Sequence, residues 1–251
     1  MKTFISFVKK DFLIAYSYKL NFLISIFSLF FTLFILSNIS KIGLNSSFLG
    51  EYKTNPFGYF IIGFSLIDLA MTISAKGINE IRGAQVSGVF EELVSNNKSK
   101  VPLLIYFFSY PIIFALIRFF LILAIGIFFF DLQINSSINL IYLLITISLL
   151  VFAFIGIGLI SSFFIVIFKR GDFVNTINLA LCIGFGNILF PSTLLNSNLQ
   201  GFSDLLPISF SVQIVREIMI GEFNITDQIY NFYGLLIASI LLLVIGVVAS
   251  N

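Results

Sequence analysis

The stretch INLIYLLITISLLVFAFIGIGLISSFFIVIF, residues Ile138–Phe168, decides the fold class of this chain. Its 31 residues include no Asp, Glu, Lys or Arg. A bilayer core about 30 Å thick needs roughly 20 apolar residues of helix, so this segment can cross a membrane with length to spare. We expect the excess to be taken up by tilt or by a bend at Gly156 and Gly158.

The same kind of run recurs along the whole chain. Of its 251 residues, 59% are hydrophobic and 10% are charged, and the mean hydropathy is +1.08. No soluble domain of this size needs so much apolar surface. We therefore predict one all-α integral membrane domain, residues 1–251, with six transmembrane helices: Leu20–Ile39, Pro56–Ala75, Val101–Phe130, Ile138–Phe168, Phe173–Phe190 and Ile229–Ser250.

The basic residues predict the orientation of these spans. Ten of the fourteen Lys and Arg precede the first span, lie between the second and third, or lie between the fourth and fifth. Cytoplasmic loops carry such an excess of positive charge, so both termini are predicted to be cytoplasmic. The segment before the first span, residues 1–19, has lysines on one helical face and apolar residues on the other. It predicts a helix in the membrane interface. The alternative is a simple cytoplasmic extension.

The segment Lys76–Lys100, KGINEIRGAQVSGVFEELVSNNKSK, is the longest charged segment between apolar runs. Charged side chains alternate there with apolar ones, and Gly83 and Gly88 allow a break or a close backbone approach. One interpretation is a docking element for a soluble partner. The other is a solvated loop whose basic residues only fix the topology. Composition alone does not separate the two.

Asp68 and Arg118 are ionisable residues well inside predicted spans. Such residues are costly in lipid and indicate function, so both are candidates for a transport pathway. Counted from the predicted cytoplasmic ends of their helices, Asp68 lies at ~12 Å and Arg118 at ~25 Å. This difference in depth predicts that the two side chains do not pair directly.

Residues 191–227 are too polar to span and too apolar for a plain loop. Pro191, Gly201 and Pro207 interrupt them. We predict short helices that re-enter the outer side of the membrane, and irregular backbone at that depth survives only against protein or a water-filled cavity. The alternative is an interfacial loop without a gating role.

Several kinds of chemistry are excluded by what the sequence lacks. It has no histidine, a single cysteine (Cys182) and no Gly-x4-Gly-Lys-Ser/Thr loop for phosphate. We therefore expect no catalytic residues, no metal site and no cofactor bound by this chain. The net charge of +2 does not suggest a nucleic-acid partner.

Three local patterns, in order along the chain, resemble the type 2 ABC exporter permeases, the membrane subunits of drug, lipid and polysaccharide exporters. The first is Ile81-Arg82 followed by Ser87–Leu93, where Val89 replaces a small polar residue and one residue is inserted before the second acid. The second is Phe168-Lys169-Arg170. The third lies in the outer region and consists of Pro191, Pro207, Arg216 and Gly221. It departs from the family in one respect, because a polar turn follows Pro191 where the family has another proline.

The resemblance implies a function for each part. Two permease copies, identical or related, would form the pathway in a bacterial-type plasma membrane. Each would dock a separate ATPase subunit, which binds ATP and Mg²⁺, through a coupling helix at Gly77–Leu93. The residues implied in coupling are Glu80, Arg82, Gly88, Phe90, Glu91, Glu92 and Leu93.

The substrate implied is amphipathic: drug-like, a lipid or lipid-linked. Two other functions stay open. A stand-alone ion-coupled transporter would be expected to have more intramembrane acids and internal symmetry. A non-transport anchoring protein would leave the charged segment and the outer region without a role.

Overall fold

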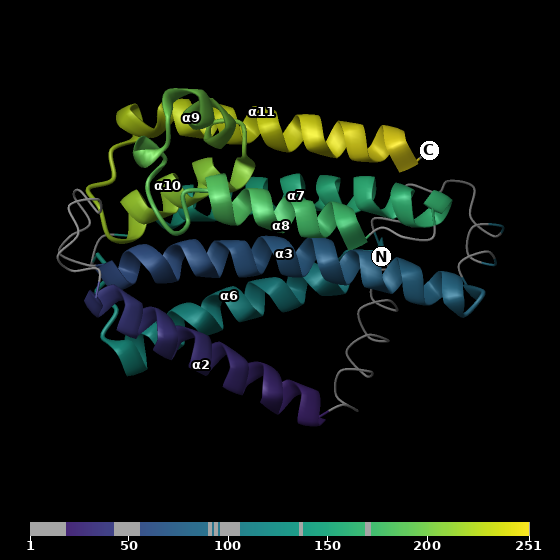
Figure 1. Cartoon of the computed structure of the whole chain (residues 1–251), viewed down its shortest axis with the longest axis horizontal. Helices are drawn as coiled ribbons and strands as arrows, with labels where there is room; N and C mark the ends of the chain where they lie inside the picture. Colours follow the sequence, from purple (N-terminus) through teal and green to yellow (C-terminus); the bar gives the residue numbers. More distant parts are fainter. Residues whose placement is uncertain are drawn as a thin grey trace.

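The computed structural model describes residues 19–42, 56–89, 92, 95, 106–135, 138–168 and 172–250 (Figure 1). Within these ranges the regular structure is entirely helical, as predicted. The predicted interfacial helix, residues 1–19, lies outside the described residues except for its last position. So do Lys169 and Arg170.

Five helices are long and apolar enough to cross a membrane: α2 (Lys19–Ile42), α3 (Pro56–Val86), α6 (Ser109–Phe130), α7 (Leu140–Phe168) and α11 (Ile225–Ser250). The chain therefore has the make-up of a multi-pass membrane protein. A further apolar helix, α8 (Asp172–Phe185), has 14 residues, or ~21 Å of helix, which is less than the bilayer core. The count of six full spans stays a prediction.

The helices run roughly along one axis, with α3 at the centre of the bundle (Figure 1). α3 packs against α2, α6, α7, α8 and α10, and α11 lies along α7. Most of α3 and α7 is buried, whereas α2 and α11 expose most of their surface. The two outer helices present the apolar surface that a bilayer would cover.

Three short helices gather at one end of the bundle: η3 (Ser192–Leu194), α9 (Ser197–Ser203) and α10 (Pro207–Met219). We call this the α10 end; it is on the left in Figure 1, and the C-terminus is at the opposite end. α10 packs against α3, α7 and α11 and is buried over most of its residues. α10 is thus a helix inside the bundle, whereas η3 and α9, which precede it, lie largely at the surface.

The structure corrects three sequence predictions about boundaries. The helix that carries the second predicted span does not end at Ala75, because α3 continues without a break to Val86. Gly77 and Gly83 are both inside this helix, and only Gly88, with φ of +73°, has a backbone that favours glycine. A turn at Phe108 interrupts the third predicted span, because Tyr106 and Phe107 are helical and α6 begins at Ser109. The last helix starts at Ile225, four residues before the predicted position.

Gly156, where the sequence predicts tilt or a bend to take up the excess length, lies within one continuous helix, α7. The residue also has a packing role. A Cβ at Gly156 would lie 2.5 Å from the backbone of Leu242 in α11, and a Cβ at Gly246 would lie 2.6 Å from the Gly156 carbonyl oxygen. Small residues let membrane helices approach closely, and here they bring α7 against α11.

Candidate functional site between α3 and α8

The short length of α8 has a local cause at the α10 end. The helix ends at Phe185, and Asn187 takes a left-handed conformation with φ of +61°. A Cβ at Gly186 would meet the Cys182 carbonyl oxygen at 2.2 Å, so a tight turn is possible there only with glycine. The carbonyls that follow this turn have no partner within α8, and another part of the chain must satisfy them.

Arg216 of α10 is that partner. Its side chain is 2% exposed, and it donates hydrogen bonds to the carbonyl oxygens of Asn187 (2.6 Å) and Ile188 (3.0 Å). It also donates two hydrogen bonds to the carbonyl oxygen of Tyr59 in α3 (2.9 and 3.2 Å), and its guanidinium lies 3.4 Å from the centre of the Tyr59 ring. One side chain thus joins α10, α3 and the end of α8, with Gly63 leaving room for it.

The other predicted residues of the outer region have structural positions around this anchor. Pro191 precedes η3 and Pro207 is the first residue of α10, where its fixed φ suits a helix start. The Gly221 amide donates to the Arg216 carbonyl (3.0 Å) and so ends α10. A Cβ at Gly221 would meet the Glu217 carboxylate at 2.4 Å. The predicted pattern from Arg216 to Gly221 is therefore a helix ending.

Asp68 and Arg118 pair directly, and the prediction that they do not was wrong. The Arg118 guanidinium donates to both carboxylate oxygens of Asp68, at 2.6 and 2.9 Å. The error came from the start of the helix: counted from Ser109, Arg118 lies ~14 Å along α6, close to the ~12 Å between Asp68 and Lys76. A bidentate arginine–carboxylate pair is strong and directional, so it fixes α3 against α6.

Lys76 continues this polar contact toward the end opposite α10. Its ammonium lies 3.0 Å from the centre of the Phe114 ring, and the Arg118 guanidinium lies 5.8 Å from the same ring. A cation over an aromatic face is stabilised by the ring quadrupole. Phe114 is thus placed between two cations that follow one another along the α3–α6 contact.

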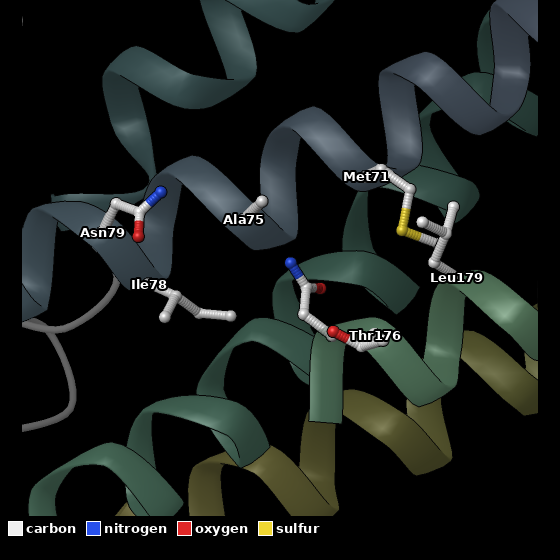
Figure 2. Close-up of a pocket in the computed structure, with 7 residues that line it drawn as sticks. Met71, Ala75, Ile78, Asn79, Thr176 and Leu179 are labelled. Carbon is white, nitrogen blue, oxygen red and sulfur yellow. The ribbon is translucent and has the colours of Figure 1, made fainter. Parts of the chain in front are cut away.

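A pocket with mixed polar and apolar lining lies between α3 and α8 (Figure 2). Its volume is about 260 Å³. Figure 2 shows the Met71 and Leu179 side chains close together at one end and Ile78 toward the other. The lining residues come from both helices: Met71, Ala75, Ile78, Asn79, Asn175, Thr176 and Leu179.

One amide from each helix, Asn79 of α3 and Asn175 of α8, gives this pocket its polar groups. Ser74 of α3 donates a 2.9 Å hydrogen bond from Oγ to Oδ1 of Asn175. One turn further on, beside the pocket, Asn178 lies between the sulfur atoms of Met71 and Cys182, at 3.9 and 3.7 Å. Polar groups at membrane depth need partners, so they lie at helix contacts or cavities. The pocket therefore offers an amphipathic molecule both amide groups and apolar walls.

The pocket residues are not among the predicted site residues. Asn175 in the pocket and Asn178 beside it are three residues apart and so share one face of α8, which is a polar stripe within an apolar run. That spacing was a usable signal. Nothing in the sequence placed Ser74 or Asn79 opposite that stripe.

The predicted coupling residues are only partly described. Glu80 and Arg82 lie in α3, and the Arg82 side chain is exposed. Gly88 and Glu92 are also exposed. The remaining coupling residues, Phe90, Glu91 and Leu93, lie outside the described residues.

A scan of the chain against protein-family models finds no match, and a search of curated proteins finds none either. The resemblance to type 2 ABC exporter permeases thus depends on the sequence patterns alone and stays a prediction.

Proposed function

We propose that this chain is the membrane-spanning permease subunit of an ATP-driven exporter. Two copies, identical or related, would form the translocation pathway, and each would dock a separate ATPase subunit that binds ATP and Mg²⁺. In this assignment the α10 end faces outward, and both termini are in the cytoplasm of a bacterial-type plasma membrane. The observation that carries the proposal is the continuity of α3 from the pocket to an exposed tip.

The length of α3 supports a docking role for its last part. A helix of 31 residues is ~46 Å long, about 16 Å more than the bilayer core. The excess belongs at the end opposite α10, because Lys76, Glu80 and Arg82 lie there. Val86 at the tip is 84% exposed. We call residues 76–86 the α3 extension, and in our proposal the ATPase contacts it and the coupling residues that follow.

The α3 extension is joined to the pocket within a single helix. Ile78 and Asn79 belong to the extension and also line the pocket. A displacement of the tip by a docked ATPase would therefore move the pocket wall directly, without an intervening hinge. Such coupling is a shift between two global states that ATP binding biases. The mixed lining of the pocket favours an amphipathic substrate, which is drug-like, a lipid or lipid-linked.

The ion pair makes a stand-alone ion-coupled transporter less well supported. That mechanism needs an acid that binds and releases a cation during the cycle. Asp68 is the acidic residue that the sequence places well inside a predicted span, and both of its carboxylate oxygens accept hydrogen bonds from Arg118. Releasing Asp68 would require breaking a bidentate pair in each cycle.

A tagged pull-down from native membranes in mild detergent, followed by mass spectrometry, tests the proposal. We expect a soluble protein with a phosphate-binding Gly-x4-Gly-Lys-Ser/Thr loop to co-purify in stoichiometric amount. A chain that purifies alone, and that transports without ATP after reconstitution, would overturn the proposal in favour of an ion-coupled carrier.

A charge reversal at the tip locates the contact. Arg82→Glu should reduce recovery of the ATPase several-fold, because it places a negative charge on the proposed docking surface. The matched control is Glu222→Lys, an exposed charge reversal at the α10 end. Equal recovery with both variants would exclude the α3 extension as the docking site.

A further inference from the structure

A groove of about 690 Å³ runs between α8 and α11, and α7 forms its floor. The residues that α11 contributes are spaced three and four apart, so they form a single stripe along one helix face. The most exposed of them are Tyr230, Tyr233, Ile237, Leu241 and Ile245. All five are more than half exposed, so the stripe is open to whatever surrounds the bundle.

The α8 wall of the groove is largely apolar, whereas its α10 end carries a charged side chain. Ile177 and Leu181 of α8 face the groove, and both are exposed large apolar residues. The link from α9 to α10, which begins at Asp204, closes the groove at the α10 end, near Tyr230. Asp204 is exposed, and it is the only charged side chain among the described residues that line the groove.

The dimensions of the groove fit a hydrocarbon chain. The stripe from Tyr230 to Ile245 covers fifteen residue steps, or ~22 Å of helix, more than the ~15 Å of one leaflet of the bilayer core. Dividing 690 Å³ by that length gives a mean cross-section of about 31 Å². Packed hydrocarbon chains contact at ~4.5 Å, which gives each a cross-section of about 20 Å². One acyl chain therefore fits along the groove.

A second protein helix fits the same space less well. A helix with its side chains is ~10–12 Å across, or at least about 80 Å² in section. Close helix contacts in membranes also need small residues at the interface. Gly234 on the α11 stripe is already covered, because a Cβ there would lie 2.5 Å from the Phe210 ring of α10. Ala238, one turn further on, is the other small residue of the stripe, and bulky Ile and Leu side chains flank it.

We propose that this groove binds one bilayer lipid whose headgroup carries an ammonium, such as phosphatidylethanolamine. Its acyl chain lies in the groove between α8 and α11, over α7, and its ammonium lies beside the Asp204 carboxylate at the α10 end. Tyr230 and Tyr233 stand at the level of the headgroup, where tyrosine is favoured. The site does not depend on the exporter assignment, since it needs only a bilayer around the bundle.

Native mass spectrometry of the full chain tests the site. The protein is exchanged into detergent with equimolar dioleoyl phosphatidylethanolamine and dioleoyl phosphatidylglycerol, which differ only in headgroup. We expect one retained phosphatidylethanolamine per chain and a preference of at least fivefold over phosphatidylglycerol. Asp204→Asn should reduce that preference to near one, and Asp227→Asn, an exposed acid outside the groove, should leave it unchanged. Equal retention of both lipids by the unmodified protein would overturn the headgroup assignment.

Variants that fill the groove test the acyl chain. Ala238→Phe places a ring in the groove and should remove the retained lipid, whereas Ile240→Phe, on an exposed part of α11 outside the groove, should not. Size-exclusion chromatography checks that each variant is folded. If Ala238→Phe is not folded, Leu181→Phe on α8 replaces it as the variant that fills the groove. A monodisperse groove-filling variant that keeps its lipid would refute the site.

Cross-linking tests whether a second copy occupies the groove. In a Cys182→Ser background, Ile237→Cys places one thiol on the groove stripe. We expect no cross-linked dimer with a short bifunctional thiol reagent in native membranes. Efficient dimer formation would mean that a protein helix lies in the groove, and the lipid proposal would be wrong.

Discussion

Replacing Arg216 with alanine should destabilise the protein more than any other single change in α10. The substitution removes four hydrogen bonds donated to three carbonyls, at 2.6, 2.9, 3.0 and 3.2 Å. The Tyr59 carbonyl is within a helix, but those of Asn187 and Ile188 follow the end of α8. A buried acceptor that loses its donor costs ~1–3 kcal/mol, so the two together cost ~2–6 kcal/mol and we expect ~4 kcal/mol.

That free energy converts to a measurable shift in melting temperature. For a chain of this size 1 kcal/mol corresponds to roughly 2–4 °C, so Arg216→Ala should lower the Tm by about 8–16 °C. Arg216→Lys should lower it by about half as much, because an ammonium keeps the charge but lacks the planar fork that reaches several carbonyls. The assay is the fraction of detergent-solubilised protein that stays monodisperse after heating, measured by size-exclusion chromatography.

The matched control is Gln213→Ala, a half-buried polar residue of the same helix with one 3.4 Å contact to Ser209. It should shift the Tm by no more than about 2–4 °C, the equivalent of ~1 kcal/mol. The reasoning is refuted if Arg216→Ala melts within the range of this control. It is also refuted if Arg216→Lys is as stable as the unmodified protein, because the geometry of the fork would then be irrelevant.

Three other predictions concern the helices around the pocket. Asp68→Asn and Arg118→Gln should each lower stability by roughly 1–3 kcal/mol, and exchanging the two residues should restore part of the loss in a double-mutant cycle. Gly156→Leu should lower the Tm because its side chain would meet the backbone of α11, whereas Gly184→Ala, where a Cβ meets nothing within 4 Å, should not. Asn175→Leu should raise the KM for an exported amphiphile several-fold without changing recovery of the ATPase; an unchanged KM would remove the pocket from the pathway.

The fold class and most of the helices were predictable because hydropathy measures the property that the bilayer selects. The run at Ile138–Phe168 became α7 within two residues. The predicted helix boundaries were wrong where a helix continues past a charged residue. Lys76 marked the predicted end of a span, but its ammonium lies over the Phe114 ring and α3 continues for ten residues. Hydropathy treats such a residue as solvated and cannot detect its partner.

The contacts of the candidate site were less predictable, because each depends on helix register across long sequence separations. Asp68 and Arg118 were identified singly as functional candidates, but their pairing depended on α6 starting at Ser109. The length of α8 depended on the turn at Asn187, which in turn depends on Arg216 twenty-nine residues later. When the depth of a residue is counted from one end of a helix, any error in the predicted position of that end becomes an equal error in the depth.

The distribution of strong contacts around α3 indicates which parts of the bundle can move. Arg216 joins α3 to α10, and the Asp68–Arg118 pair joins α3 to α6, so these three helices form one unit along most of the bundle. Among the described residues, the contacts of the body of α8 with α3 are different in kind, and they include a hydroxyl–amide hydrogen bond and a weak amide–sulfur contact around an open pocket. On its other side α8 borders the groove instead of packing closely on α11. A force applied at the tip of α3 would therefore move α3, α6 and α10 together with the α10 end of α8, which Arg216 holds, and the displacement would appear along the rest of α8, beside the pocket.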